Sequence, residues 1–175
     1  AIQKIALTEK IEFINRPKKI SGDKSNVYLA INHVLNSIKS KTKYKYIVLL
    51  QPTSPLRPKN LIKNGIKLLK RNKNFQNLIH LEKTNYHIGS VSKKNEWKSN
   101  YKNISRGQEI ENQYRPSGCL FIYQIKDFEN YNKFLKRKTF GFFESTDFVT
   151  VNIDTEVDFM LLDFLLKRNN KLLTF

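Results

Sequence analysis

Short apolar runs alternate with longer amphipathic stretches along this chain. Residues 44–50 are almost continuously apolar, which predicts a strand buried at the centre of a parallel sheet. Shorter apolar runs predict further strands at residues 77–81, 117–123 and 148–153, and residues 10–15 form a brief β-like run. Residues 83–112 are polar and irregular, which indicates a long loop or an inserted β region.

Helical spacing of apolar residues marks the segments between these runs. The predicted helices cover residues 1–6, 24–37, 58–69, 127–135 and 154–165. Asp23 can cap the second helix, and Pro58 suits the first position of the third. The first segment reads as the end of a helix whose beginning lies elsewhere.

Strands that alternate with helices predict an α/β domain with a mainly parallel sheet. Ligands of such sheets bind beyond the carboxyl ends of the strands. Two polar motifs lie at such ends, at residues 51–57 and 152–156. These two motifs are therefore the first candidates for a functional site.

Length and composition indicate one domain that covers residues 1–175, with 39% hydrophobic and 12% aromatic residues. The apolar runs are too short for a membrane span, and the first ten residues do not resemble a signal peptide. The one cysteine, Cys119, has no partner for an internal disulfide. We therefore expect a cytoplasmic protein.

The net charge of +17 has two interpretations. It could reflect an anionic partner such as a nucleic acid, a nucleotide or an acidic sugar. It could equally reflect a composition rich in lysine, asparagine and isoleucine throughout. The lysines are scattered along the chain, so we favour composition over nucleic-acid binding.

The first polar motif, residues 51–57, ends a predicted buried strand with an amide, two hydroxyl groups and a guanidinium. Its two prolines fix the turn, so the polar groups lose little entropy when they bind a ligand. A plain helix-entry turn, capped by Thr53 or Ser54, explains the same residues about equally well.

The run Leu-Gln-Pro-Thr-Ser-Pro-Leu-Arg at residues 50–57 resembles the signature of the acylneuraminate cytidylyltransferases. Three other segments are similar to motifs of that family and follow in the family's order: Arg16-Pro17, residues 114–122 and residues 152–158. The resemblance covers the whole chain. It implies a three-layer, Rossmann-like nucleotidyltransferase fold with a mainly parallel sheet.

This resemblance also implies a reaction. The anomeric hydroxyl of a nonulosonic acid (a nine-carbon sugar acid such as sialic acid) attacks the α-phosphate of CTP, and pyrophosphate leaves with help from Mg²⁺. Arg16 would contact the cytosine, and Asp154 would be a catalytic Mg²⁺ ligand. Asn152 replaces the first aspartate of the family's metal pair, so an amide oxygen would serve as the second ligand with one negative charge fewer.

On the sugar side, the resemblance implies that Gln51 holds the sugar acid with Thr53 beside it. Arg115 would face the acid group, and Arg106 corresponds to the arginine of the family's Arg-Gln pair. An intervening Gly107 makes that second assignment weaker. The sequence does not identify which nonulosonic acid is bound.

Family members begin with a strand and a phosphate-gripping loop that these 175 residues lack. We therefore expect the fold without its first βα unit, and little or no activity from this chain alone. The resemblance further implies a homodimer that pairs through the region after residues 117–123. The aromatic residues of that region could form the interface or, almost equally well, pack within the domain: Phe128, Tyr131, Phe134, Phe140, Phe142 and Phe143.

Three hypotheses remain open. The first is a cytidylyltransferase that activates a sialic-acid-like sugar. The second is a degenerate remnant of that family, which the missing loop and Asn152 favour. The third is a basic nucleic-acid-binding module, which has no reason to carry both the signature at residues 51–57 and the Asp154 motif.

Overall fold

A computed structural model describes residues 2–38, 43–84, 86–101, 106–109, 113–128, 139–142 and 150–168. Internal contacts divide the chain into two compact units. One contains Ala1–Tyr46 and Gln124–Phe134, and the other contains Ile47–Tyr123 and Leu135–Phe175. A single domain over residues 1–175 stays a prediction.

The first unit contains α1 (Ile2–Thr8), the 3₁₀-helix η1 (Lys18–Ile20), α2 (Val27–Ser37) and α4 (Ile125–Phe128). The cap of α2 is Asn26, whose side chain accepts a hydrogen bond from the backbone N–H of Tyr28 at 2.9 Å. Asp23 was therefore the wrong cap. The β-like run at residues 10–15 was also wrong, because those residues form a turn and irregular backbone instead of a strand.

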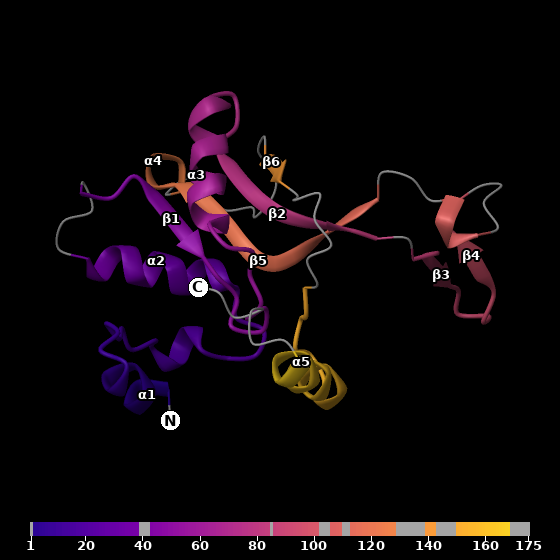
Figure 1. Cartoon of the computed structure of the whole chain (residues 1–175), viewed down its shortest axis with the longest axis horizontal. Helices are drawn as coiled ribbons and strands as arrows, with labels where there is room; N and C mark the ends of the chain where they lie inside the picture. The colour runs from indigo at the N-terminus through magenta and orange to yellow at the C-terminus, as the bar shows by residue number, and fades with distance from the viewer. Residues whose placement is uncertain are drawn as a thin grey trace. The chain divides into compact units, whose positions relative to one another are not determined.

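Apart from the end residues Tyr46 and Gln124, the main sheet belongs to the second unit. Its strand order is β1 (Tyr46–Leu49), β5 (Tyr114–Gln124), β2 (Asn77–Lys83) and β6 (Thr139–Phe142). β2 pairs parallel with β6 and antiparallel with β5. Figure 1 shows β1 also running opposite to β5. Three strands thus share one direction and β5 opposes them. The predicted α/β fold class is confirmed, with β5 as the exception to a parallel sheet.

β1 lies at the end of this described sheet, where we expected a central strand. Its four residues are only half-buried. The expected strand at residues 148–153 is wrong for residues 150–153, which form no strand, while residues 148 and 149 lie outside the described part of the chain. The strand β6 was not predicted.

Two helices of the second unit meet the core at named positions. In α3 (Leu61–Arg71), a Cβ atom at Gly65 would lie 2.9 Å from Ile122 Cδ1 and 3.0 Å from Leu120 Cδ2, so the helix packs very closely on β5. In α5 (Glu156–Arg168), Leu162 packs with Leu56 and Val151. The prediction that residues 154–156 open the last helix is confirmed.

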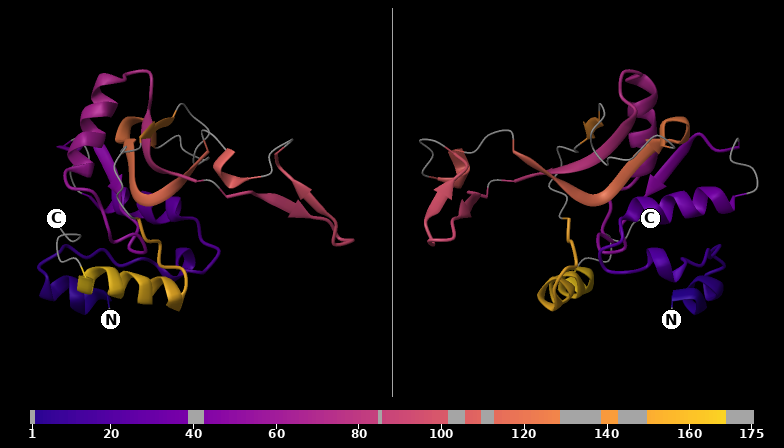
Figure 2. Two further views of the ribbon diagram at one scale, coloured as in Figure 1. Left: turned by 45° about the vertical axis from the view of Figure 1, so that its right-hand side comes forward. Right: turned by 180° about the vertical axis from the view of Figure 1, so that it is seen from behind.

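A hairpin of β3 (Gly89–Val91) and β4 (Trp97–Ser99) forms a separate two-stranded sheet, and a 3₁₀-helix, η3 (Gly107–Glu109), follows it. Both views in Figure 2 show this hairpin beyond the ends of β2 and β5. Residues 83–112 therefore contain an inserted β region, one of the two outcomes that the polar pattern allowed.

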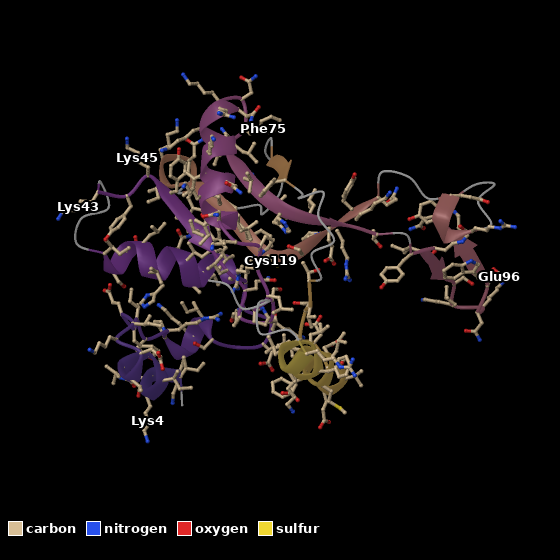
Figure 3. The ribbon with its side chains drawn as sticks, in the orientation of Figure 1. Lys4, Lys43, Lys45, Phe75, Glu96 and Cys119 are labelled. Atoms are coloured by element: carbon tan, nitrogen blue, oxygen red, sulfur yellow. The ribbon has the colours of Figure 1, made fainter. Side chains whose placement is uncertain are left out.

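Cys119 lies in the middle of β5, among the side chains of the sheet, whereas Glu96 points outward from the hairpin (Figure 3). Burial raises the pKa of the Cys119 thiol, which donates a hydrogen bond to the Leu56 carbonyl at 3.3 Å. Within the described residues, no helix has both the length and the apolar character that crossing a membrane requires.

Of the aromatic residues expected at a dimer interface, the structure describes the side chains of Phe128 and Phe142. Phe128 is fully buried and stacks on Tyr28 at a ring distance of 4.8 Å, and Phe142 is buried against His80. These two residues pack inside the chain. The remaining members lie outside the described residues or have side chains that the structure does not describe: Tyr131, Phe134, Phe140 and Phe143.

Candidate active site

The loop that follows β1 is fixed by hydrogen bonds to β5. The Gln51 backbone N–H donates to the Gly118 carbonyl at 3.3 Å. Arg57 donates from Nη2 to the Gln51 carbonyl at 2.7 Å and from Nε to the Cys119 carbonyl at 3.2 Å. The guanidinium of Arg57 thus holds the loop against the strand, and the side chain of Gln51 remains exposed.

Ser54 is the buried centre of this loop, with no exposed surface. Its hydroxyl lies 3.1 Å from the Ser117 carbonyl and 3.1 Å from Oδ1 of Asn152, and can donate to either oxygen. Gly118 has a φ of +77°, and a Cβ atom there would collide with Oγ of Ser54 and lie 2.6 Å from Oε1 of Gln51. Only glycine fits this close approach without strain.

The second polar motif lies directly beside the first. The Ile153 backbone N–H donates to the Thr53 carbonyl at 2.8 Å. With the Ser54–Asn152 contact, this bond joins the loop after β1 to the segment before α5. The amide Nδ2 of Asn152 donates to Oδ2 of Asp154, whose carboxylate is exposed.

The start of α5 fixes the other side of Asp154. Thr155 and Asp158 cap the helix reciprocally: Oδ2 of Asp158 accepts from the Thr155 N–H and hydroxyl, each at 2.8 Å, and the Asp158 N–H donates to Oγ1 of Thr155 at 3.3 Å. The Asp154 N–H also donates to Asp158, at 3.1 Å. The Thr155 hydroxyl and these backbone bonds lower the pKa of Asp158.

A buried histidine lies beneath the first loop. His80 is on β2, at an irregularity in its pairing with β5, and its Nδ1 lies 2.7 Å from Oγ of Ser117. Ser117 also accepts from the Cys119 N–H at 3.1 Å. Burial lowers the pKa of His80, so its imidazole is neutral at pH 7. His80 is therefore a hydrogen-bonded part of the buried support of the loop.

The predicted site residues fall into three groups. Gln51, Thr53, Asn152 and Asp154 lie on the two joined loops. Arg115 and Arg106 lie elsewhere in the same unit: Arg115 forms an ion pair with Glu82, and Arg106 precedes η3. Arg16 belongs to the other unit, in an exposed segment where Ser21 donates to the Arg16 carbonyl at 3.3 Å.

The donor atoms test whether Mg²⁺ would fit. Asp154 offers an exposed carboxylate, a ligand that Mg²⁺ prefers. Asn152 turns its oxygen toward Ser54 and its nitrogen toward Asp154, so it cannot share a cation with Asp154 unless its amide rotates. Among the described residues, no group of three or more acidic, histidine or cysteine side chains is placed to hold a metal. The site therefore fits a cation held by one carboxylate, with its other ligands from substrate phosphates or water.

A groove of about 910 Å³ runs along α3 and is not this site. Pro55 and Arg57 of the first loop line it, but Gln51, Asn152 and Asp154 do not. Its lining combines the apolar side chains of Leu50, Ile62 and Ile66 with basic residues of the helix. The candidate site is thus defined by two hydrogen-bonded loops and not by this groove.

Sequence reasoning missed three residues that shape the site: Ser54, Arg57 as a loop tether, and Gly118 as a φ-positive close approach. A buried serine between two prolines gave no signal beyond a possible helix cap. Gly118 belongs to the motif at residues 114–122, but its close approach to the first loop could be recognised only from the backbone conformation.

No protein-family model matches the chain. The chain is 24% identical over 173 residues to the N-acylneuraminate cytidylyltransferase of Escherichia coli O18:K1:H7 (strain RS218 / NMEC), with 95% of this chain and 40% of that protein covered. This chain thus spans less than half the length of that relative. The likeness supports a relationship to cytidylyltransferases.

A solved structure gives a second comparison. The fold is similar to that of 4-diphosphocytidyl-2C-methyl-D-erythritol synthase from Anaerococcus prevotii DSM 20548, with a TM-score of 0.60 and 12% sequence identity. The match covers 95% of this chain and 76% of the other. It confirms a nucleotidyltransferase-type α/β fold.

Proposed function

We propose that this chain provides the sugar-acid side and the metal side of a cytidylyltransferase site that transfers CMP from CTP to a nonulosonic acid. The observation that carries the proposal is the junction of the two loops, which brings the neighbourhood of Gln51 and that of Asp154 together from 103 positions apart in the sequence. The 24% identical relative is named for this reaction.

Each polar group has a defined part in the proposal. The exposed amide of Gln51 both donates to and accepts from sugar hydroxyls, and Arg57 keeps its backbone in place. Asp154 would hold Mg²⁺, which when bound neutralises the charge of the phosphates. Because phosphoryl-type transfer depends on positioning and charge, a rigid pair of loops suits it better than a nucleophilic side chain would.

Three arginines are proposed as further substrate-binding residues. Arg16 is proposed for the cytosine, and Arg106 and Arg115 for the sugar acid. Arg115 is 55% exposed on its side chain and already pairs with Glu82. An acidic sugar would therefore compete with Glu82 for this guanidinium, which makes Arg115 a weaker candidate than Gln51.

This chain covers only 40% of the length of the relative, so the first test of the proposal measures ligand binding and not turnover. Saturation-transfer NMR with a CMP-activated nonulosonic acid and Mg²⁺ should show contact with the chain. Gln51→Ala and Asp154→Ala should each lower the affinity for this ligand about tenfold or more. Lys73→Ala, at an exposed position, should leave the affinity unchanged. A pyrophosphate-release assay with CTP and a panel of nonulosonic acids measures turnover in the same samples.

The alternatives give different results. Tight binding of random DNA with a steep dependence on salt, and no response to the CMP-sugar, would favour a nucleic-acid-binding module. A native chain that binds neither the CMP-sugar nor DNA would contradict the proposal and favour a degenerate remnant of the family.

We also propose that the chain forms a homodimer. The support lies on α5, where four apolar residues at helical spacing are exposed on one face: Val157, Met160, Leu161 and Phe164. Leu162 on another face is buried in the core. A helix that is apolar on both faces is normally covered on both.

A further inference from the structure

We propose that Ser54 is a positioning residue of the candidate site: its buried hydroxyl fixes the amide of Asn152, and Asn152 in turn holds the carboxylate of Asp154. The functional consequence rests on the proposed role of Asp154 in binding a divalent cation. The contacts from Ser54 through Asn152 to Asp154 do not depend on that role. The positioning role of Ser54 and the cation-binding role of Asp154 can therefore be disproved separately.

The contacts run in one direction from the core to the surface. Ser54 is fully buried, Asn152 is exposed and 98 positions away, and the Ser54 hydroxyl meets Oδ1 of Asn152 at 3.1 Å. The amide of Asn152 is planar, so once its oxygen faces Ser54, its nitrogen lies on the other branch of the group, turned away from Ser54. That nitrogen donates to Oδ2 of Asp154. A hydrogen bond to a carboxylate is stronger than one between neutral groups.

Ser54 could instead serve only to hold its own turn, but other groups already do so. The Ser54 backbone N–H donates to the Gln51 carbonyl at 3.1 Å, and Arg57 ties the same carbonyl at 2.7 Å. The Ser54 side chain reaches outward from this turn, to Asn152 and to the Ser117 carbonyl. The single proton of the hydroxyl can go to only one of these two oxygens, and when it goes to Oδ1 of Asn152 the hydroxyl orders the second loop.

This arrangement gives Asn152 a role other than that of a metal ligand. An aspartate at this position would place a second negative charge beside Asp154 and would be held apart from it by repulsion. Asn152 instead donates to Asp154 and needs the correct amide orientation, which its oxygen contact with Ser54 favours. The Ser54 hydroxyl therefore matters at this site because residue 152 is an asparagine.

A double-mutant cycle on the whole chain tests the proposal, with Mn²⁺ and the CMP-activated nonulosonic acid together as the probe and electron paramagnetic resonance as the readout. Removing a group that orients a metal ligand commonly costs about tenfold or more in affinity. Ser54→Ala and Asn152→Ala should therefore each weaken Mn²⁺ binding about tenfold, and the double variant should lose no more than either single variant. Ser92→Ala, which removes a hydroxyl from the β3–β4 turn, is the matched control. Multiplied losses in the double variant, or unchanged affinity in a folded Ser54→Ala variant, would overturn the proposal.

A second readout needs no metal. The ¹⁵N order parameter of the Asn152 side-chain amide should be high in the native chain and should fall in Ser54→Ala, while that of the exposed Asn100 amide stays the same. If the native chain shows no Mn²⁺ binding that Asp154→Ala removes, the proposed function is wrong at its metal site, and the order parameter alone decides on Ser54. An Asn152 amide that is equally ordered in both proteins would disprove the positioning role.

Discussion

Two constraints require glycine at position 118: its backbone conformation and the close approach of two side chains. Its φ of +77° disfavours any side chain, and a Cβ atom would meet both Ser54 and Gln51. We expect Gly118→Ala to lower the free energy of unfolding by about 2–4 kcal/mol, because strain and collision act together. Urea unfolding followed by circular dichroism measures this change.

The control for that substitution is Gly22→Ala. A Cβ atom at Gly22 would meet only Oγ of Ser25, at an ordinary 3.6 Å. We expect a change within about 0.5 kcal/mol at this surface position. Equal losses in the two variants would show that the site loop does not depend on the close approach.

His80 leads to a prediction about pH. Burial lowers its pKa in the folded chain, while the unfolded chain keeps a value of about 6.5. Below about pH 6.5 the unfolded chain therefore binds a proton that the folded chain does not, and stability falls as the pH falls. Thermal unfolding at pH 7.5 and pH 5.5 should show a smaller loss for His80→Asn than for the native chain. His33→Asn controls for the removal of an imidazole, and identical losses in all three proteins would contradict this account.

Among single residues, the sequence could predict the exposed ends of the motifs but not their buried support. Gln51 and Asp154 each follow a predicted apolar run, so their proximity could be inferred, although residues 150–153 before Asp154 form no strand. The orientation of the Asn152 amide could not, because it depends on a hydroxyl 98 positions away. Such contacts leave no periodic pattern in the sequence.

At the scale of elements, the cap of α5 makes the site sensitive to acid. Asp158 has a lowered pKa because Thr155 donates to it, so its stabilising effect is complete above about pH 4 and is lost as the pH falls through the folded value. We expect Asp158→Asn to lower the melting temperature at pH 7 and to differ less from the native chain at pH 3. A difference that stays constant with pH would show that the charge of Asp158 is irrelevant to the cap.

The strongly patterned elements were predicted well, and the short or exposed ones were not. The helices α2, α3 and α5 were expected near their observed positions, since each shows helical spacing over at least three turns. β1 was wrongly placed at the sheet's centre because an apolar run does not determine the order of strands, and its residues are only half-buried. β6 has only four residues, which is too short for a periodic signal.

For the whole molecule, the exposed face of α5 predicts how two copies would pair. The first turn of α5 contains Glu156 and Asp158, and its last turn contains Lys167 and Arg168. An antiparallel second copy would bring the acidic end of each helix beside the basic end of the other while it covers both apolar faces. The helix is thus complementary in charge to itself.

We therefore expect a dimer in light scattering at micromolar concentration, and a monomer after Met160→Glu, because a buried carboxylate would oppose the contact. Lys94→Glu, a charge change in the β3–β4 turn, should leave the dimer intact. A native chain that is monomeric at 100 μM would disprove the homodimer, and a dimer that survives Met160→Glu would disprove this interface.

The bare backbone at Gly65 has an evolutionary consequence. Any side chain there would push against Ile122 and Leu120, whose methyl groups lie 2.9 Å and 3.0 Å from the added atom. In a set of diverged relatives, position 65 should accept alanine or serine only where position 122 has shrunk to valine or alanine. Correlated substitution at these two columns would then identify, from sequences alone, the chains that share this spacing between helix and sheet.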